Sequence, residues 1–170
     1  MENNRDHTTT APPLGRYRID TGASAVVFRT RHLFGLAPVR GTFAVRSGTV
    51  DIAEPLGASA VRVEIDAASF TTGSGARDGA VRSARFLDTA RHPVLTYATD
   101  GITEAALTGT LTVCGVSRPV TLAIEEYAMT PEGFTARATT RIDRTEFGVT
   151  ASRGMAGRYL EVELTVSCVR

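Results

Sequence analysis

The stretch Val61-Arg-Val-Glu-Ile-Asp66 alternates apolar and charged side chains without a break. Leu160-Glu-Val-Glu-Leu-Thr-Val166 does the same near the end of the chain, and Leu107-Thr-Gly-Thr-Leu-Thr-Val113 alternates with threonine. Because successive side chains of a strand point to opposite faces, each stretch predicts a strand with one dry face and one wet face. Antiparallel sheets that pack on one face have this pattern.

The same signal extends over most of the chain from Tyr17 onward and predicts nine strands. They lie near residues 16–20, 24–33, 38–51, 58–68, 93–101, 104–114, 117–129, 133–143 and 157–169. The breaks between them are short and rich in Gly, Pro or Asp, and Glu132-Gly133 is a candidate for a tight turn. Many strands with short turns favour a sandwich or a barrel, and a barrel leaves no free strand edge. We therefore expect an all-β fold.

One segment, residues 76–87, has a helical period instead. Its apolar residues recur at helical spacing, at Ala76, Ala80, Val81, Ala84 and Leu87. Thr72 or Ser74 is placed to cap the start of this helix. We expect a single short helix that closes one end of a barrel.

Length and composition describe an ordinary globular chain. The 170 residues are 42% hydrophobic and 22% charged, with a formal net charge of +1. We expect one domain over 16–170 after a flexible tail over 1–15. The near-neutral charge disfavours a nucleic-acid binder, which needs clustered basic residues to contact phosphates. No apolar run is long enough to span a membrane.

The start of the chain has no apolar segment of the secretory type, so we expect a cytoplasmic protein. In that compartment Cys114 and Cys168 are expected to be reduced thiols.

Common catalytic and metal-binding motifs are missing from the sequence. All 19 basic residues are Arg, which excludes lysine Schiff-base chemistry and a P-loop. There is no CxxC, HxH, HExxH or GxSxG motif, so we expect no metal, no cofactor and no catalytic residues. The glycines of Gly73-Ser-Gly75 and Gly79 do not have dinucleotide-loop spacing, and a loop leading into the helix explains them.

Two polar residues near predicted strand ends each have two interpretations. His32 is either a hydrogen-bonded residue of the barrel rim or a donor to a ligand head group. Arg144 either holds a phosphate or carboxylate, or forms an ion pair with Asp143, Glu146 or Asp78.

Apolar and aromatic side chains dominate the predicted inward face. If the sheet closes around them, they either fill the interior as a core or line an apolar cavity, because barrels of about eight strands lie at that threshold. The absence of Trp and the abundance of small residues favour a partly open interior.

An ordered series of short motifs resembles the YceI-like proteins over roughly 17–169. The series begins with Tyr17-Arg-Ile-Asp20, Val27-Phe28, His32 and Gly41-Thr-Phe43. It continues with Ser69, Arg77-Asp78, Phe86-Leu-Asp88 and His92-Pro-Val-Leu-Thr-Tyr97, and ends with the segments 107–120 and Arg144-Thr-Glu-Phe-Gly148. At Ala23-Ser24 the chain departs from the early His-Ser pair of that family.

The resemblance implies an extended antiparallel eight-stranded, lipocalin-like β-barrel. It also implies a long amphiphilic ligand in the apolar lumen, namely a polyisoprenoid, an isoprenoid quinone or a fatty-acid amide, and a possible homodimer. The ligand would serve carriage, storage or sequestration. The lumen residues we expect are Phe28, Phe43, Val45, Val63, Tyr97, Leu111 and Phe147. The expected residues of the mouth are His32, Arg77, Asp78 and Arg144.

Two other functional classes stay open from the residues alone. A filled barrel would act as a scaffold through protein contacts, and an exposed apolar patch would favour that interpretation. An enzyme acting on a lipid head group is the remaining alternative, and it would need turnover that depends on Arg144 or His32.

Overall fold

The computed structural model describes residues 11–170. Nine strands make up most of the described chain: β1 (Gly15–Ile19), β2 (Ala25–His32), β3 (Ala37–Ile52), β4 (Ala60–Thr71), β5 (Val94–Ile102), β6 (Ala106–Val113), β7 (Val116–Thr130), β8 (Gly133–Asp143) and β9 (Tyr159–Val169). The helix α1 (Gly75–Arg82) follows β4, and the 3-10 turns η1 (Thr21–Ala23), η2 (Leu56–Ala58) and η3 (Arg144–Phe147) lie between strands. Residues 1–10, most of the expected tail, are outside the described residues.

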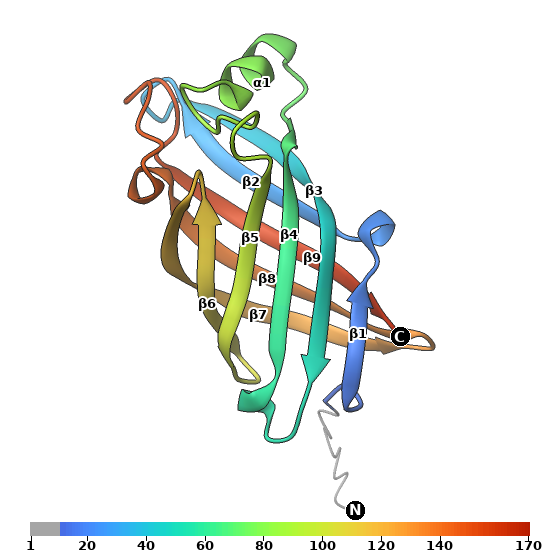
Figure 1. Cartoon of the computed structure of the whole chain (residues 1–170). Helices are drawn as coiled ribbons and strands as arrows, with labels where there is room; N and C mark the ends of the chain where they lie inside the picture. The colour runs from blue at the N-terminus through green and yellow to red at the C-terminus, as the bar shows by residue number, and fades with distance from the viewer. Residues whose placement is uncertain (1–10) are drawn as a thin grey trace, which may run out of the picture.

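The strands close into an antiparallel barrel (Figure 1). The ring runs β2, β9, β8, β7, β6, β5, β4 and β3, and β3 pairs again with β2, so the ring leaves no edge strand open. β1 pairs with the end of β3 and with the last residues of β9. β1 and β2 therefore share one position in the wall, separated by the η1 turn. The prediction of an extended eight-stranded barrel with one short helix is confirmed.

The alternation that predicted the fold is visible in the burial of β4. Val61, Val63 and Ile65 are buried, while Arg62 and Glu64 between them are exposed. The apolar side chains fill the barrel interior and the charged ones face water, so the hydrophobic effect sets the face that each residue presents.

Two tight turns differ in how they reverse the chain. Cys114 and Gly115 both have positive φ, 51° and 75°, as a two-residue hairpin turn requires. The predicted turn at Glu132-Gly133 is one residue too late, because Pro131 and Glu132 form the turn and Gly133 already pairs with Val169 in the sheet. A Cβ at Gly133 would overlap the carbonyl oxygen of Cys168, so this glycine permits close backbone packing.

The helix is shorter than predicted. It begins as expected, with the Ser74 side chain capping the N–H of Arg77, but it ends at Arg82 instead of Leu87. Ser83 is extended, and its hydroxyl donates to the carbonyl of Ala80. A serine that bonds the preceding turn competes with the helix backbone, which explains the early end.

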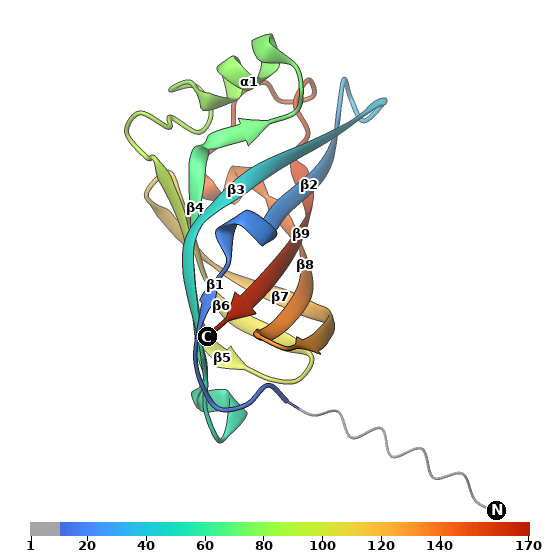
Figure 2. The same ribbon diagram turned by 90° about the vertical axis from the view of Figure 1, so that its right-hand side faces the viewer.

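The two ends of the barrel have different connections (Figure 2). We call one end the mouth end; it carries the connections 33–36, 72–93, 114–115 and 144–158, including α1. The opposite end, the far end, carries 53–59, 103–105 and 131–132. The two longest connections, 72–93 and 144–158, both lie at the mouth end. Loops and α1 can therefore cover this end of the barrel more than the far end.

Candidate ligand-binding cavity

A cavity of about 480 Å³ occupies the mouth-end half of the barrel. All eight strands of the ring contribute side chains to its wall, and α1, the segment after it and the connection 144–158 contribute the rest. Sites for small organic ligands measure roughly 300–1,000 Å³ and are mostly apolar. The cavity reaches the surface where the exposed residues Leu33, Arg85 and Met155 line it.

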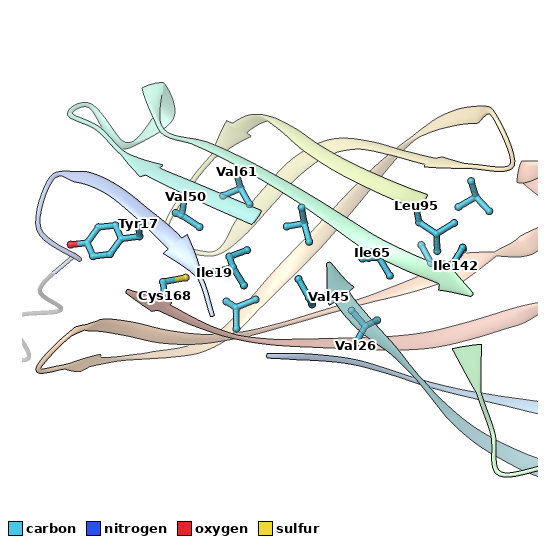
Figure 3. Close-up of a cluster of buried hydrophobic side chains, with 14 of the residues drawn as sticks. Tyr17, Ile19, Val26, Val45, Val50, Val61, Ile65, Leu95, Ile142 and Cys168 are labelled. Atoms are coloured by element: carbon cyan, nitrogen blue, oxygen red, sulfur yellow. The ribbon is translucent and has the colours of Figure 1, made fainter. Parts of the chain in front are cut away.

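The far-end half of the barrel is filled by a packed cluster, which forms the floor of the cavity (Figure 3). Tyr17, Ile19 and Cys168 are almost completely buried there, and Val50 and Val61 pack with them. The ring of Tyr17 meets that of Phe134 edge to face, 5.0 Å between centroids. Burial raises the pKa of Cys168 to about 12, so this thiol stays protonated and serves as a packing group. The cavity is therefore blind at this end.

Three aromatic rings form one side of the cavity wall. Phe28 stacks on Phe70 at 5.2 Å, and Phe43 contacts both rings at 5.6 and 5.4 Å. Gly41 lies opposite Phe28 in the sheet, and a Cβ there would overlap the Phe28 ring. The sequence thus places a glycine where the ring must lie against the wall.

Tyr97 of β5 lines the cavity, and its side chain reaches across β6 to the backbone of β7. Its hydroxyl donates to the carbonyl of Val120 at 2.8 Å and lies 3.3 Å from that of Leu107. Gly109 leaves room for the ring, since a Cβ there would lie 2.9 Å from Cζ of Tyr97. Burial, with a smaller contribution from Asp100, raises the pKa of Tyr97 to about 12. The phenol is a neutral group that is already hydrogen-bonded, so the wall beside it stays apolar in character.

Arg144 is part of the framework of the mouth end. Its guanidinium donates to the carbonyl oxygens of Gly157 (2.7 Å), Val149 (2.8 Å) and Ala156 (3.3 Å). These bonds hold the connection 144–158 in place, and burial lowers the pKa of the group. Arg144 forms an ion pair with none of its candidate partners Asp143, Glu146 and Asp78: Asp143 pairs with Arg158 at 2.9 Å, and the Asp78 carboxylate is bonded to Thr71 and Thr72.

Asp78 belongs to α1; its side chain is buried and does not line the cavity. Its carboxylate accepts hydrogen bonds from the N–H and hydroxyl of Thr72 and from the hydroxyl of Thr71. Burial alone would raise the pKa of Asp78, but these hydrogen bonds outweigh it and hold the pKa below its usual value. The residue fixes the connection between β4 and α1.

Three polar side chains of the mouth retain unused donors. His32 and Arg77 line the cavity as expected, and Arg85 joins them from the segment after α1. Arg77 uses only its Nε, which donates to the Thr72 hydroxyl at 2.8 Å. Within residues 11–170, the terminal nitrogens of Arg77 and the side chains of His32 and Arg85 form no hydrogen bond or ion pair. These are the groups that can contact a ligand head group.

The structure brings together nine of the eleven residues expected at the ligand: Phe28, His32, Phe43, Val63, Arg77, Tyr97, Leu111, Arg144 and Phe147. Two lie elsewhere. Val45 is buried in the barrel interior opposite Ile65 but does not line the cavity, and Asp78 holds α1 to the end of β4. The alternation of β3 indicates which face Val45 takes, but not which of the inward residues border the cavity.

The eleven residues expected at the ligand leave out several residues of the wall, although the sequence already placed Phe70 and Phe86 among the aromatic residues expected inside the barrel. Phe70, Phe86 and Leu87 line the cavity from the end of β4 and from the segment after α1. Arg85 also lies there, and its spacing of four from Val81 and eight from Arg77 is the only sequence signal that points to it. The predicted helix over 76–87 included Arg85, Phe86 and Leu87, but the helix in the structure ends at Arg82, before it reaches them.

Two other kinds of site were tested on the described residues. Over residues 11–170, His, Cys, Asp and Glu side chains do not gather in any group of three that could hold a metal ion. Among the same residues, no helix is long and apolar enough to cross a membrane.

Comparison with known proteins gives both a sequence and a structural match. The model of the YceI-like domain family matches residues 17–169. Protein YceI of Salmonella arizonae is 34% identical, with an alignment that covers 96% of this chain and 91% of that protein.

The solved structures agree in fold. BcnA of Burkholderia cenocepacia superposes with a TM-score of 0.75 at 20% identity, covering 87% of this chain and 98% of BcnA. A polyisoprenoid-binding domain from Saccharophagus degradans, implicated in plant cell wall breakdown, superposes with a TM-score of 0.70 at 16% identity, covering 92% and 99%.

Proposed function

The chain belongs to the YceI-like family, and from this premise we propose that it binds one long amphiphilic lipid in the barrel lumen. The observation that carries the proposal is a cavity with an apolar wall, a packed floor and one open end. Such a shape accepts a chain-like molecule tail first and leaves its head at the mouth. The similar fold of the polyisoprenoid-binding domain from Saccharophagus degradans supports the same class of ligand.

The energy of binding comes from the tail. Each CH₂ group that leaves water for an apolar site contributes about 0.8 kcal/mol, so an isoprenoid or acyl tail needs no polar contact in the lumen. The ligand classes that fit are a polyisoprenoid, an isoprenoid quinone and a fatty-acid amide. His32, Arg77 and Arg85 are the head-group contacts we propose, because their donors have no partner in the described part of the chain.

The proposed role is binding for carriage, storage or sequestration, without catalysis. Arg144, the residue that a head-group enzyme would use, is held by three carbonyl oxygens of the framework. His32 has no acidic or nucleophilic partner within hydrogen-bonding distance in the described residues. A general base needs an orienting partner, so this arrangement favours binding.

Native mass spectrometry of the purified protein, followed by solvent extraction, tests the proposal. We expect one lipid per chain, or stoichiometric uptake from a total-lipid extract. The variant Leu111→Arg places a charge in the apolar wall and should abolish uptake. Thr110→Arg is the matched control, because the neighbouring residue is exposed on the outer face and should bind as the wild type does.

Circular dichroism establishes that both variants are folded before uptake is compared. Unchanged uptake by folded Leu111→Arg would remove the lumen assignment. A bare polypeptide mass, with no uptake from the extract, would favour the scaffold function. The cytoplasmic location and the homodimer remain predictions, which cell fractionation and analytical ultracentrifugation measure.

A further inference from the structure

Large apolar side chains are exposed together at the mouth end. The tip of the β2–β3 hairpin, residues 33–36, exposes 76% of Phe34 and 82% of Leu36. Met155, from the neighbouring connection, is 49% exposed. Single exposed apolar residues are common on protein surfaces, but a contiguous group at the entrance of a cavity indicates an interaction surface. Figure 2 shows this hairpin projecting past the barrel at the end that carries α1.

The tip is held in one position by backbone contacts. The N–H of Leu33 donates to the carbonyl of Met155 at 2.8 Å, and that of Phe34 donates to Gly154. Leu33 and Phe34 have φ of 53° and 57°, a left-handed region in which Gly, Asn and Asp are the usual residues. A turn that only reversed the chain would use those small residues. Here large apolar side chains occupy these positions: Leu33 lines the cavity entrance, and the Phe34 ring lies against Gly154 while most of its surface stays exposed.

Charge separates the two ends of the barrel. The mouth-end connections carry seven arginines, and their acidic residues are Asp78, Asp88 and Glu146, a net charge of +4. The far-end connections carry three glutamates and no basic residue, a net charge of −3. Near the tip, Arg31 and Arg40 are also exposed. Neither of them, nor the exposed Arg85 and Arg153, forms an ion pair within residues 11–170.

We propose that the mouth end docks on the surface of an anionic lipid bilayer, with Phe34 and Leu36 inserted among the head groups. The surrounding arginines face the lipid phosphates, and the cavity opens toward the membrane. This inference rests on the proposed function, because it supplies the route by which a lipid enters and leaves the lumen. An apolar tip surrounded by cations is the pattern of peripheral proteins that bind anionic membranes.

Charge also decides between a bilayer and a second copy of the chain. Two copies that met through this end would oppose +4 with +4, and like charges across an interface disfavour association. An anionic bilayer neutralises the same charge. Each arginine near an anionic surface strengthens binding by roughly fivefold, and salt weakens the attraction.

Vesicle co-sedimentation tests the docking surface. The full chain is mixed with vesicles of phosphatidylcholine alone, or of equal parts phosphatidylcholine and phosphatidylglycerol. We expect binding to the anionic vesicles that falls as salt rises. Phe34→Ser/Leu36→Ser should weaken binding at least tenfold, and Arg31→Glu/Arg40→Glu should weaken it more at low salt. Neither pair lines the cavity.

Matched controls change the same chemistry away from the mouth. Arg46→Glu/Arg62→Glu makes the same change in net charge on the exposed wall of β3 and β4 nearer the far end. Met129→Ser removes an exposed apolar side chain from β7 close to the far end. Both controls should bind anionic vesicles within about twofold of the wild type. Equal losses in the controls and the mouth-end variants would overturn the proposal.

Lipid uptake from detergent micelles, measured by native mass spectrometry, separates this inference from the proposed function. The tip variant should load as much lipid as the wild type at equilibrium and transfer it from vesicles more slowly. A wild-type protein that loads lipid but ignores anionic vesicles refutes docking and leaves the proposed function. Vesicle binding without any loading refutes the proposed function alone. If there is no vesicle binding and the tip variant dissociates a dimer, the surface is a contact between copies.

Discussion

Arg77 and Arg144 carry the same guanidinium group at the same end of the barrel, yet Arg144 uses all three of its nitrogens in hydrogen bonds to the backbone, whereas Arg77 uses one of its three. Arg144 donates to three backbone carbonyls, so its removal would leave those oxygens without a partner. Arg77 makes one side-chain hydrogen bond and keeps its terminal nitrogens free of partners in the described structure. At the scale of single residues, existing partners decide which cation is structural and which can bind.

A substitution at Gly41 tests the packing of a single residue against the cavity wall. In Gly41→Ala the new methyl group overlaps the Phe28 ring, so the aromatic side of the cavity must shift. We expect a loss of roughly 1–3 kcal/mol in the free energy of unfolding, measured by urea denaturation, as for other overpacked sites.

Gly79→Ala is the control for this substitution. Gly79 lies in α1 with no atom within 4 Å of the added carbon, so alanine should stabilise the chain by about 0.5–1 kcal/mol. Equal effects of the two substitutions would contradict the contact assigned to Gly41.

The elements at the mouth depend on short polar contacts more than on their own propensity. α1 has only eight residues, too few for a helix that is stable in isolation. Ser74 caps its first turn, and the Asp78 carboxylate ties it back to the end of β4. The segment after it is anchored by the thiol of Cys114, which donates to the carbonyl of Leu87 at 3.1 Å. The part of the mouth end formed by α1 and the segment after it is thus held by side-chain hydrogen bonds to the neighbouring strands.

Asp78→Ala should therefore loosen this element. The substitution leaves the donors of Thr71 and Thr72 without their acceptor, which costs roughly 1–3 kcal/mol of stability. Hydrogen–deuterium exchange should rise in residues 72–82 and stay unchanged in the packed far-end half. An equal increase in exchange along the whole chain would contradict the local role assigned to Asp78.

The pKa of Asp78 adds a pH dependence to the same element. Because the folded-state pKa lies below the ordinary value of 3.8, ionised Asp78 contributes stability above that pH. The contribution is lost as the pH falls below it through the folded-state pKa. The wild type should lose stability in that acid range more steeply than Asp78→Ala.

The whole molecule divides into a packed half and a hollow half. Tyr17, Ile19 and Cys168 fill the far end and stabilise the barrel without a ligand. The mouth-end half encloses about 480 Å³ that its own side chains do not fill. A ligand that fills this space adds apolar contacts to the folded state only, so binding and stability are linked.

Removal of the bound lipid should lower the melting temperature. A ligand at a hundredfold excess over its Kd stabilises by about 2.7 kcal/mol, which corresponds to roughly 5–10 °C for a chain of this size. Differential scanning calorimetry before and after solvent extraction measures the change. Leu111→Arg should melt at one temperature regardless of extraction. A wild type that also melts unchanged, although lipid was removed, would mean that the ligand lies outside the barrel.

The sequence by itself determined the strands and the face that each inward residue takes. Period-two alternation depends only on the geometry of an extended chain and on the exclusion of apolar groups from water, and both are local. That is why Phe28, Val63 and Leu111 could be placed on the inward face; for the helix cap the sequence left Thr72 and Ser74 as candidates, and Ser74 is the cap. The ordered series of motifs that resembles the YceI-like proteins added the prediction that the strands close into an eight-stranded ring.

Only the tertiary structure decided which inward residues line the cavity and which groups the polar side chains contact. Val45 and Phe43 both belong to the barrel interior, but only Phe43 lines the cavity. Arg144 donates to backbone carbonyls of the connection 144–158, and no local sequence pattern predicts the conformation of that connection. The exposed tip and the arginines of the other connections also lie together only because the folded barrel brings them to the same end. Contacts between segments distant in sequence are set by ring closure, and closure is a property of the whole chain.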